Sequence, residues 1–275
     1  MQQVRFPMNP TTLTHGTVAI AATFARRKAE GRATFMPYWM IGYPDLPTSI
    51  DIVKLLLDSG ADMVEIGIPF SDPLADGVVV QAAAQRALES GTTLRACIEA
   101  VRELRAYNAD VPFLMMGYTN PFMAYGLTRL ADDAAAAGAD GFIIPDLPPD
   151  EAGEMLREVV AHGLALVELL APTSNAERIK LVAETARGFI YLVPVTGVTG
   201  VRTSLPPDLA AYIARVRAQT DLPLAVGFGV STPEHAAQIG KLADGVIVAS
   251  AFIREYERNG LEKMRALVQS IRAAC

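Results

Sequence analysis

The sequence has few of the residues that build disulfide frameworks and metal centres. Its 275 residues include three histidines and two cysteines, Cys97 and Cys275. Two cysteines do not make a disulfide scaffold, so we expect reduced thiols in a cytoplasmic protein. Neither cysteine has a histidine or a second cysteine at metal-ligand spacing, and we predict no metal.

Long apolar runs and positive charge are also scarce. No uninterrupted apolar run approaches the roughly 20 residues that cross a bilayer, and the first residues lack the apolar core of a signal peptide, so we predict neither a membrane span nor export. The formal net charge of −6 argues against nucleic acid or an anionic membrane as the partner. Residues 1–16 are expected to form a flexible tail, and residues 17–275 a single domain.

The rest of the composition is that of a globular protein, with 51% hydrophobic and 20% charged residues. One pattern recurs three times: a helical stretch ends, an Ala-Asp pair follows, and a short apolar strand begins. Such strands are typical of a parallel sheet that is buried on both faces. The three pairs are Ala61-Asp62, Ala139-Asp140 and Ala243-Asp244.

The same alternation extends over the whole chain and predicts about eight strands. Alternating strands and helices favour parallel βαβ units, and eight such units close most economically into a (β/α)₈ TIM barrel. An open doubly wound sheet is the alternative, but no Gly-x-Gly-x-x-Gly follows the first strand. An extra helix at residues 17–31 is expected over the bottom of the barrel. The strands are expected near 35–42, 63–67, 112–116, 141–145, 164–168, 189–193, 222–227 and 245–249, and the helices near 49–57, 94–107, 127–136, 149–161, 176–185, 207–219 and 233–240.

The second strand and the loop after it hold three carboxylates. Glu65 lies in an apolar strand, where a charge is costly unless it is paired or needed for chemistry. Asp72 and Asp76 follow in a turn-rich loop at the strand end, where barrels place their active sites. Glu65 is therefore an acid/base candidate. A satisfied structural partner is the alternative for Glu65, and a turn role is the alternative for both aspartates.

Other strand ends carry further candidates. Tyr118 follows the third strand, Asp146 the fourth, and Tyr191 lies on the sixth. The tyrosines could equally be core aromatics, and Asp146 more readily starts a helix than binds a ligand. Small residues follow the last three strands, where backbone N–H groups and a helix start can bind phosphate. They are Gly197–Gly200, Gly227–Ser231 and Ala249–Ala251.

Several motifs in order carry a resemblance to a known family. The segment from Glu65 to Gly77, EIGIPFSDPLADG, closely resembles the signature of the tryptophan synthase α subunit family. The likeness extends from about Ile20 to Ile253 and implies a TIM barrel. The other motifs are Pro37-Tyr38, Gly42-Tyr43-Pro44, Asn120-Pro121, Pro145-Asp146-Leu147-Pro148, Gly197-Val198-Thr199-Gly200 and Gly227-Phe228-Gly229.

The resemblance implies a retro-aldol cleavage of indole-3-glycerol phosphate to indole and glyceraldehyde 3-phosphate, without metal or organic cofactor. It implies that Glu65 is the acid/base, that Asp76 binds the indole N–H, and that Tyr191 helps to position Glu65. The residues that match the indole slot are Tyr38, Met116, Tyr118 and Ile143. Those that match the phosphate pocket are Gly200, Gly229, Ala249 and Ser250.

Two positions depart from the family pattern. Pro194 replaces a small polar residue before the sixth loop, where a proline would stiffen a hinge. Ala249 replaces a glycine in the eighth loop and adds a methyl group near the phosphate.

The resemblance also implies a partner, a pyridoxal-phosphate β subunit that receives indole in an α₂β₂ complex. Asp72, Pro73 and Thr199 match the loops that respond to it. Two alternatives stay open: a standalone lyase that releases indole, and a catalytically silent barrel that activates another subunit. The presence of both Glu65 and Asp76 disfavours the silent barrel.

Overall fold

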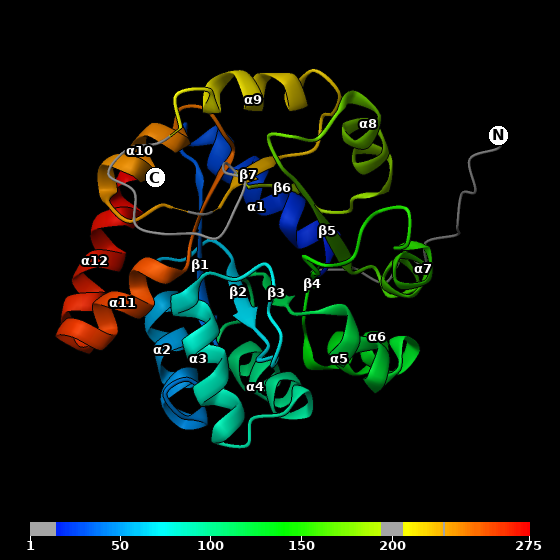
Figure 1. Ribbon diagram of the computed structural model, residues 1–275. Coiled ribbons are helices and arrows are strands. Elements are labelled where there is room, and N and C mark those ends of the chain that lie inside the picture. Colours follow the sequence, from blue (N-terminus) through cyan, green and yellow to red (C-terminus); the bar gives the residue numbers. More distant parts are fainter. Residues whose placement is uncertain (1–14, 194–205, 228) are drawn as a thin grey trace.

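The computed structural model describes residues 15–193, 206–227 and 229–275 (Figure 1). Eight parallel strands form a closed barrel in sequence order, and the first strand pairs with both the second and the eighth. The predicted (β/α)₈ barrel is confirmed. The strands are β1 (Thr34–Met40), β2 (Val64–Gly67), β3 (Phe113–Met116), β4 (Gly141–Ile143), β5 (Ala165–Leu170), β6 (Ile190–Leu192), β7 (Leu224–Val226) and β8 (Gly245–Val248).

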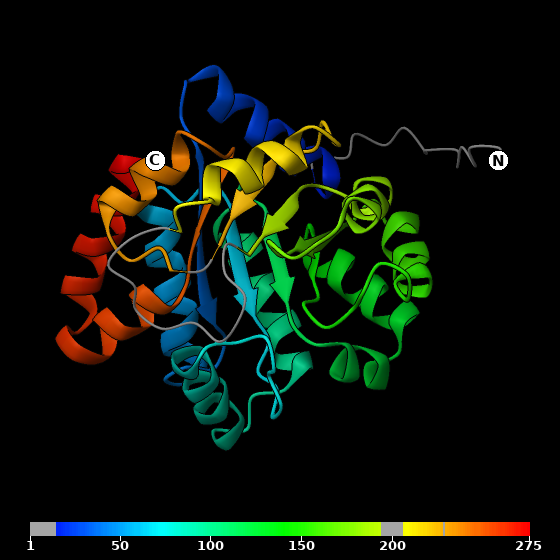
Figure 2. The same cartoon turned by 45° about the horizontal axis from the view of Figure 1, so that its top comes forward.

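Helices surround the barrel, as the two views in Figures 1 and 2 show. The seven helices expected after strands are present in the described residues, with ends that shift by a few positions. The helices are α1 (Thr17–Ala29), α2 (Leu46–Asp58), α3 (Val78–Glu89), α4 (Leu94–Tyr107), α5 (Thr119–Tyr125), α6 (Leu127–Ala137), α7 (Gly153–Ala161), α8 (Ala176–Thr185), α9 (Leu209–Arg217), α10 (Pro233–Gly240), α11 (Ser250–Asn259) and α12 (Leu261–Ala274).

Four of these helices, α3, α5, α11 and α12, were not expected from the sequence. Each belongs to a pair of helices that follows one strand, whereas the sequence pattern predicts one helix after each strand. The start of α7 also differs from the expected residue 149, because residues 149–152 form a turn before it. None of the helices in the described ranges is both long and apolar enough to cross a membrane.

The helix α1 lies against the N-terminal ends of the strands, as predicted. Its Phe24 ring packs on Phe189, just before β6, with ring centroids 5.5 Å apart. Gly16, at the start of the helix, donates its N–H to Asp140 Oδ1 over 2.6 Å. These contacts close the end of the barrel opposite the strand ends that should carry the site. The part of the predicted tail before residue 15 lies outside the described residues.

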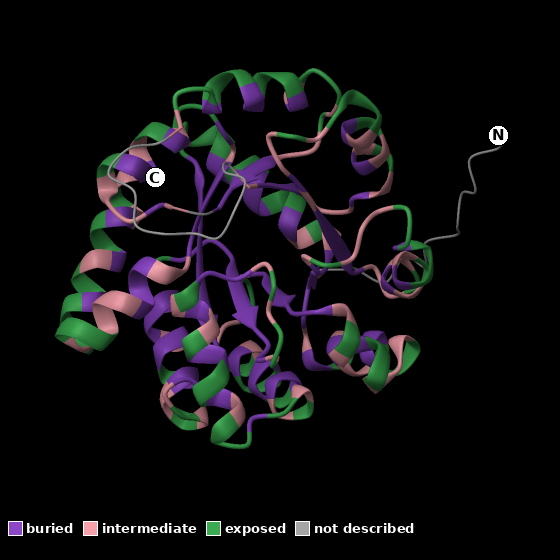
Figure 3. Ribbon diagram, viewed as in Figure 1, coloured by how far each residue is buried: buried purple, intermediate pink, exposed green. Residues whose placement is uncertain are grey.

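The local sequence explains where several helices begin. Four of them start after a polar residue whose side chain accepts a hydrogen bond from the backbone N–H three positions on, which satisfies a donor that the helix itself leaves unpaired. These residues are Asp45, Thr93, Asn175 and Thr232. The strands between the helices are almost completely buried, as their purple ribbons in Figure 3 show.

The recurring Ala-Asp pairs have one structural role. Each aspartate lies just before a strand and accepts an N–H from the start of the preceding strand, and each also binds an arginine. The bonds measure 2.8–2.9 Å and join Phe35 N to Asp62, Phe113 N to Asp140, and Leu224 N to Asp244. The aspartate of each pair therefore joins its strand to the preceding strand at the bottom of the barrel.

Glu168 on β5 is a buried carboxylate of a different kind. Only 4% of its surface is exposed, and among the described residues neither of its carboxylate oxygens has a hydrogen-bond partner. The nearby Thr185 hydroxyl instead donates to the Leu181 carbonyl over 2.8 Å. Burial raises the pKa of Glu168 from 4.5 to about 7, and the nearby Thr185 and then the charges of Arg178 and Arg187 only partly oppose that rise.

We predict that Glu168→Gln stabilises the protein at pH 8. Because the folded pKa is raised, the wild type loses stability as the pH rises from about 4.5 through about 7. The amide does not titrate, so the gain in unfolding free energy should be about 1–3 kcal/mol at pH 8 and shrink as the pH falls. Urea unfolding at several pH values measures it. The exposed Glu184→Gln, on the helix α8 that packs against β5, is the control, and an equal gain there, or none at Glu168, would contradict the prediction.

Candidate active site

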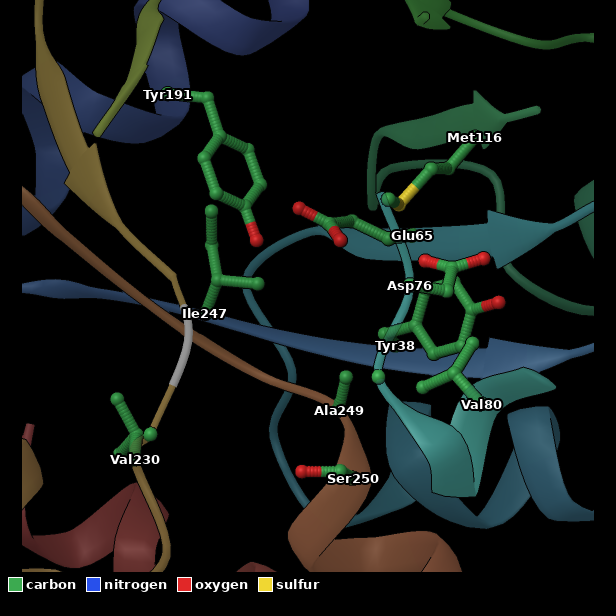
Figure 4. Close-up of a pocket in the computed structure, with 12 residues that line it drawn as sticks. Tyr38, Glu65, Asp76, Val80, Met116, Tyr191, Val230, Ile247, Ala249 and Ser250 are labelled. Atoms are coloured by element: carbon green, nitrogen blue, oxygen red, sulfur yellow. The ribbon is translucent and has the colours of Figure 1, made fainter. Parts of the chain in front are cut away.

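A pocket opens among the carboxyl ends of the strands, on the side opposite α1. Side chains from β1, β2, β3, β6 and β8 meet there with the loops after β2 and β7 (Figure 4). This is the position at which TIM barrels place their chemistry. The lining residues are Tyr38, Glu65, Asp76, Gly77, Val80, Met116, Tyr191, Gly229, Val230, Ile247, Ala249 and Ser250.

Glu65 lies on β2 beside Tyr38 of β1, its partner in the strand register, and its carboxyl group points into the pocket (Figure 4). Only 1% of the residue is exposed, and Oε1 has no hydrogen-bond partner among the described residues. Burial and, second, the negative charge of Asp76 raise the pKa of Glu65 well above its usual value. The carboxyl group can therefore hold a proton near neutral pH and give it up to a nearby base.

Asp76 lies at the end of the loop after β2, just before α3, and faces the same pocket as Glu65 (Figure 4). Burial raises the pKa of Asp76 from 3.8 to about 6, and a hydrogen bond from the Tyr118 hydroxyl opposes that rise. Asp76 is thus an anion at neutral pH. The two carboxyl groups differ in protonation because they share one pocket but have different partners.

Tyr38 and Tyr191 lie near Glu65, and each packs so closely against a glycine that no larger residue fits there. The Tyr191 hydroxyl points toward Glu65 (Figure 4), and burial followed by the charges of Glu65 and Asp76 raises the pKa of this phenol. A Cβ atom on Gly227 would lie 1.9 Å from the Tyr191 hydroxyl oxygen, and one on Gly67 would lie 2.2 Å from that of Tyr38. Any other residue at these two positions would displace a ring.

The other end of the pocket suits an anion. Gly229 has a positive φ of 81°, and a Cβ atom built on it would meet no atom within 4 Å, so the space on that side of the residue is open. Ser250 and Ala249 lie at the N-terminus of α11, where backbone N–H groups are unpaired within the helix and carry a partial positive charge. The Ser250 hydroxyl accepts a hydrogen bond from Arg254 Nη2 over 3.4 Å.

Several predicted site residues do not line the pocket. Tyr118 and Ile143 are buried beside it, and the Tyr118 hydroxyl accepts the N–H of Ala75 over 3.2 Å in the loop after β2. Asp72 and Pro73 lie in the same loop, with Asp72 exposed and bonded to the Ser71 hydroxyl. The predictions for Thr199, Gly200 and Pro194 lie outside the described residues.

The expected role of Asp146 at the start of the following helix is wrong. The next helix, α7, begins only at Gly153. Asp146 Oδ1 instead accepts both the N–H and the hydroxyl of Thr119, over 2.9 and 3.0 Å, at the first residue of α5. The aspartate thus supplies an acceptor to a helix that precedes it in the chain.

Among the described lining residues, sequence reasoning missed Val80 and Ile247, whereas Val230 and Gly77 lie in the predicted stretches Gly227–Ser231 and Glu65–Gly77. Ile247 could have been found, because it lies two residues before Ala249 and side chains two apart on a strand share a face. Val80 could not, since its helix α3 was not expected. In the described ranges no group of three histidine, cysteine or acidic side chains is arranged to hold a metal ion, and both cysteines are free and buried.

Comparison with known proteins identifies relatives over nearly the whole chain. The family model described as tryptophan synthase alpha chain matches residues 24–274. The tryptophan synthase alpha chain of Chloroflexus aggregans is 51% identical over 239 residues, which are 87% of this chain and 90% of that protein. That of Roseiflexus castenholzii is 51% identical over 240 residues, 87% of this chain and 92% of that protein.

Solved structures agree with these relatives. A chain of Mycobacterium tuberculosis tryptophan synthase superposes with a TM-score of 0.87 at 38% identity, covering 93% of this chain and 97% of that one. The tryptophan synthase subunit alpha of Legionella pneumophila gives a TM-score of 0.85 at 39% identity, with coverages of 93% and 97%.

We predict that Gly227→Ala displaces Tyr191. The added methyl group would lie 1.9 Å from the phenol oxygen, so the ring must move by about 1 Å or more, at a cost of about 1–3 kcal/mol in the free energy of unfolding. A crystal structure and urea unfolding of the variant measure both effects. Gly153→Ala, at a position where a Cβ atom has open space, is the control. An unmoved Tyr191 with unchanged stability would contradict the prediction.

Proposed function

Because the chain belongs to the tryptophan synthase alpha chain family, we propose that it is a lyase that cleaves indole-3-glycerol phosphate to indole and glyceraldehyde 3-phosphate. One observation carries this assignment beyond the family: the pocket holds two buried carboxyl groups at one end and an anion-binding helix start at the other. This arrangement suits a substrate with a ring nitrogen and a proton-transfer centre at one end and a phosphate at the other.

The reaction requires two proton movements at one carbon–carbon bond. Indole C3 gains a proton, the glycerol hydroxyl on C3′ loses one, and the C3–C3′ bond then breaks as the aldehyde carbonyl forms. Glu65 supplies the proton to C3 and takes one from the hydroxyl, and its raised pKa favours the protonated form that the first transfer needs. Tyr191 keeps the Glu65 carboxyl group in place.

The charge that develops on the indole nitrogen needs an anion beside it. Protonation at C3 leaves positive charge on that nitrogen, and Asp76, ionised above pH 6, accepts the N–H and stabilises the charge. Its buried position strengthens the interaction, since water does not screen it. The ring then lies among apolar side chains at the carboxylate end, with Tyr38 and Met116 in the pocket and Tyr118 and Ile143 behind it.

The phosphate is assigned to the backbone around Gly229, Ala249 and Ser250, and Gly200, which lies outside the described residues, stays a predicted contact. The partial positive charge of the α11 N-terminus favours an anion there, and the described residues that line the pocket include no lysine or arginine. The methyl group of Ala249 narrows this end relative to the glycine of the family pattern.

A tryptophan synthase β subunit is the proposed partner, in an α₂β₂ complex that consumes the indole. The surface beside the pocket supports this, because Leu74 is 87% exposed, Val78 is 65% exposed and Met123 is 58% exposed. Apolar side chains that are open to water at the mouth of a site favour a protein contact. Asp72, Pro73 and Thr199 belong to the loops that would respond to this contact.

The direct test is turnover with a matched variant. We expect the purified chain to release indole from indole-3-glycerol phosphate, faster with a β subunit present, and Glu65→Gln to lower turnover by about 10²-fold or more because an amide cannot shuttle protons. Indole is measured in single and multiple turnovers, with circular dichroism to check folding. Turnover of the variant within tenfold of wild type would contradict the role of Glu65. A wild-type chain that is inactive with and without the partner would contradict the proposed function.

Asp76 gives a separate prediction. Asp76→Asn should lower kcat by about a hundredfold with little change in KM, because the lost charge acts on the transition state. Wild-type kcat/KM should also fall as the pH drops through about 6, where Asp76 takes up a proton. Asp72→Ala, in the exposed part of the same loop, should instead affect mainly activation by the partner. A change confined to KM in Asp76→Asn would contradict the assignment.

A further inference from the structure

Gln81, near the start of α3, forms hydrogen bonds with the loop that carries Asp76. Its side-chain amide Nε2 donates to the Asp76 carbonyl over 2.8 Å and reaches the Pro73 carbonyl over 3.4 Å. Both acceptors belong to the loop between β2 and α3, and one of them is the carbonyl of the catalytic aspartate itself. Gln81 is not among the residues that line the pocket.

The same loop has other internal bonds that converge on Asp76. The Asp76 N–H donates to the Pro73 carbonyl over 3.0 Å, which closes a tight turn. The Ala75 N–H donates to the Tyr118 hydroxyl over 3.2 Å, and that hydroxyl also bonds the Asp76 carboxylate. The Gln81 amide ties the two ends of this turn to the helix. The loop is otherwise open, since Ser71, Asp72 and Leu74 are exposed.

We propose that Gln81 is a positioning residue that holds the backbone of Asp76 so that its carboxylate faces Glu65. The Gln81 side chain does not line the pocket itself, and it reaches the site through the backbone of the loop that ends at Asp76. This inference rests on the proposed function, in which Asp76 stabilises charge on the substrate nitrogen. A side-chain amide suits the task because it donates to two backbone carbonyls and adds no charge near two carboxyl groups.

The test compares two variants with a matched control. Gln81→Met keeps the length but cannot donate, and Gln81→Glu keeps the shape but presents acceptors to the two carbonyls when ionised. Each should lower kcat for indole-3-glycerol phosphate by about tenfold or more, with KM within about threefold, because a misplaced group costs transition-state stabilisation. Gln85→Met, one turn further along α3, should match wild type, because among the described residues the Gln85 amide bonds only Glu89.

A double-mutant cycle separates positioning from a general loss of structure. If Gln81 acts through Asp76, then Gln81→Met added to Asp76→Asn should change kcat by less than about twofold. Thermal unfolding of each variant shows whether the fold is kept, and Gln81→Glu replaces Gln81→Met in the cycle if the latter does not fold.

Three results would overturn the inference: kcat of the Gln81 variants within twofold of wild type, a loss confined to KM, or an undiminished loss in the Asp76→Asn background. If wild type turns over and Asp76→Asn is impaired while the Gln81 variants are normal, only this inference fails. If wild type does not cleave the substrate with its partner present, the proposed function fails instead.

Discussion

The site depends on one costly arrangement, the burial of Glu65 and Asp76 in a single pocket. Removal from water disfavours the ionised form of each group, and the charge of Asp76 further opposes ionisation of Glu65. The shared pocket thus favours the protonated form more strongly at Glu65 than at Asp76, whereas both carboxyl groups would be ionised in water at neutral pH. The remaining structure has to hold two groups together that would separate if they were free to move.

Buried carboxylates at the two ends of the barrel differ in their hydrogen bonds. Asp140, at the bottom, is completely buried but accepts hydrogen bonds from Gly16, Phe113 and Arg105. Glu65, at the top, is as deeply buried and has an oxygen without a partner among the described residues. A satisfied carboxylate stabilises the fold, whereas an unsatisfied one is available to a substrate. Asp140 and its two counterparts therefore join neighbouring strands at the bottom, while Glu65 leaves an acceptor open at the top.

The sequence predicted the barrel well because its strands are short apolar runs, each preceded by a helix end, and this pattern depends on few long-range contacts. It failed for α3, α5, α11 and α12, since nothing in the pattern says that one strand is followed by two helices. Glu65 and Asp76 could be chosen because carboxylates stand out in and after an apolar strand. Gln81 could not, because its contact is from a side chain to a backbone carbonyl and leaves no pattern in the chain.

Glu168 shows why a buried glutamate in a strand is not by itself a sign of function. Like Glu65 it lies on an apolar strand, has oxygens without partners in the described part of the chain, and has a raised pKa. It differs in its surroundings, because the groups that act on it are Thr185, Arg178 and Arg187, in and just after α8, rather than a second carboxylate. It also does not line the pocket. A raised pKa by itself indicates only burial. A functional site is indicated when a second carboxylate, a pocket and an anion-binding helix start occur together with it.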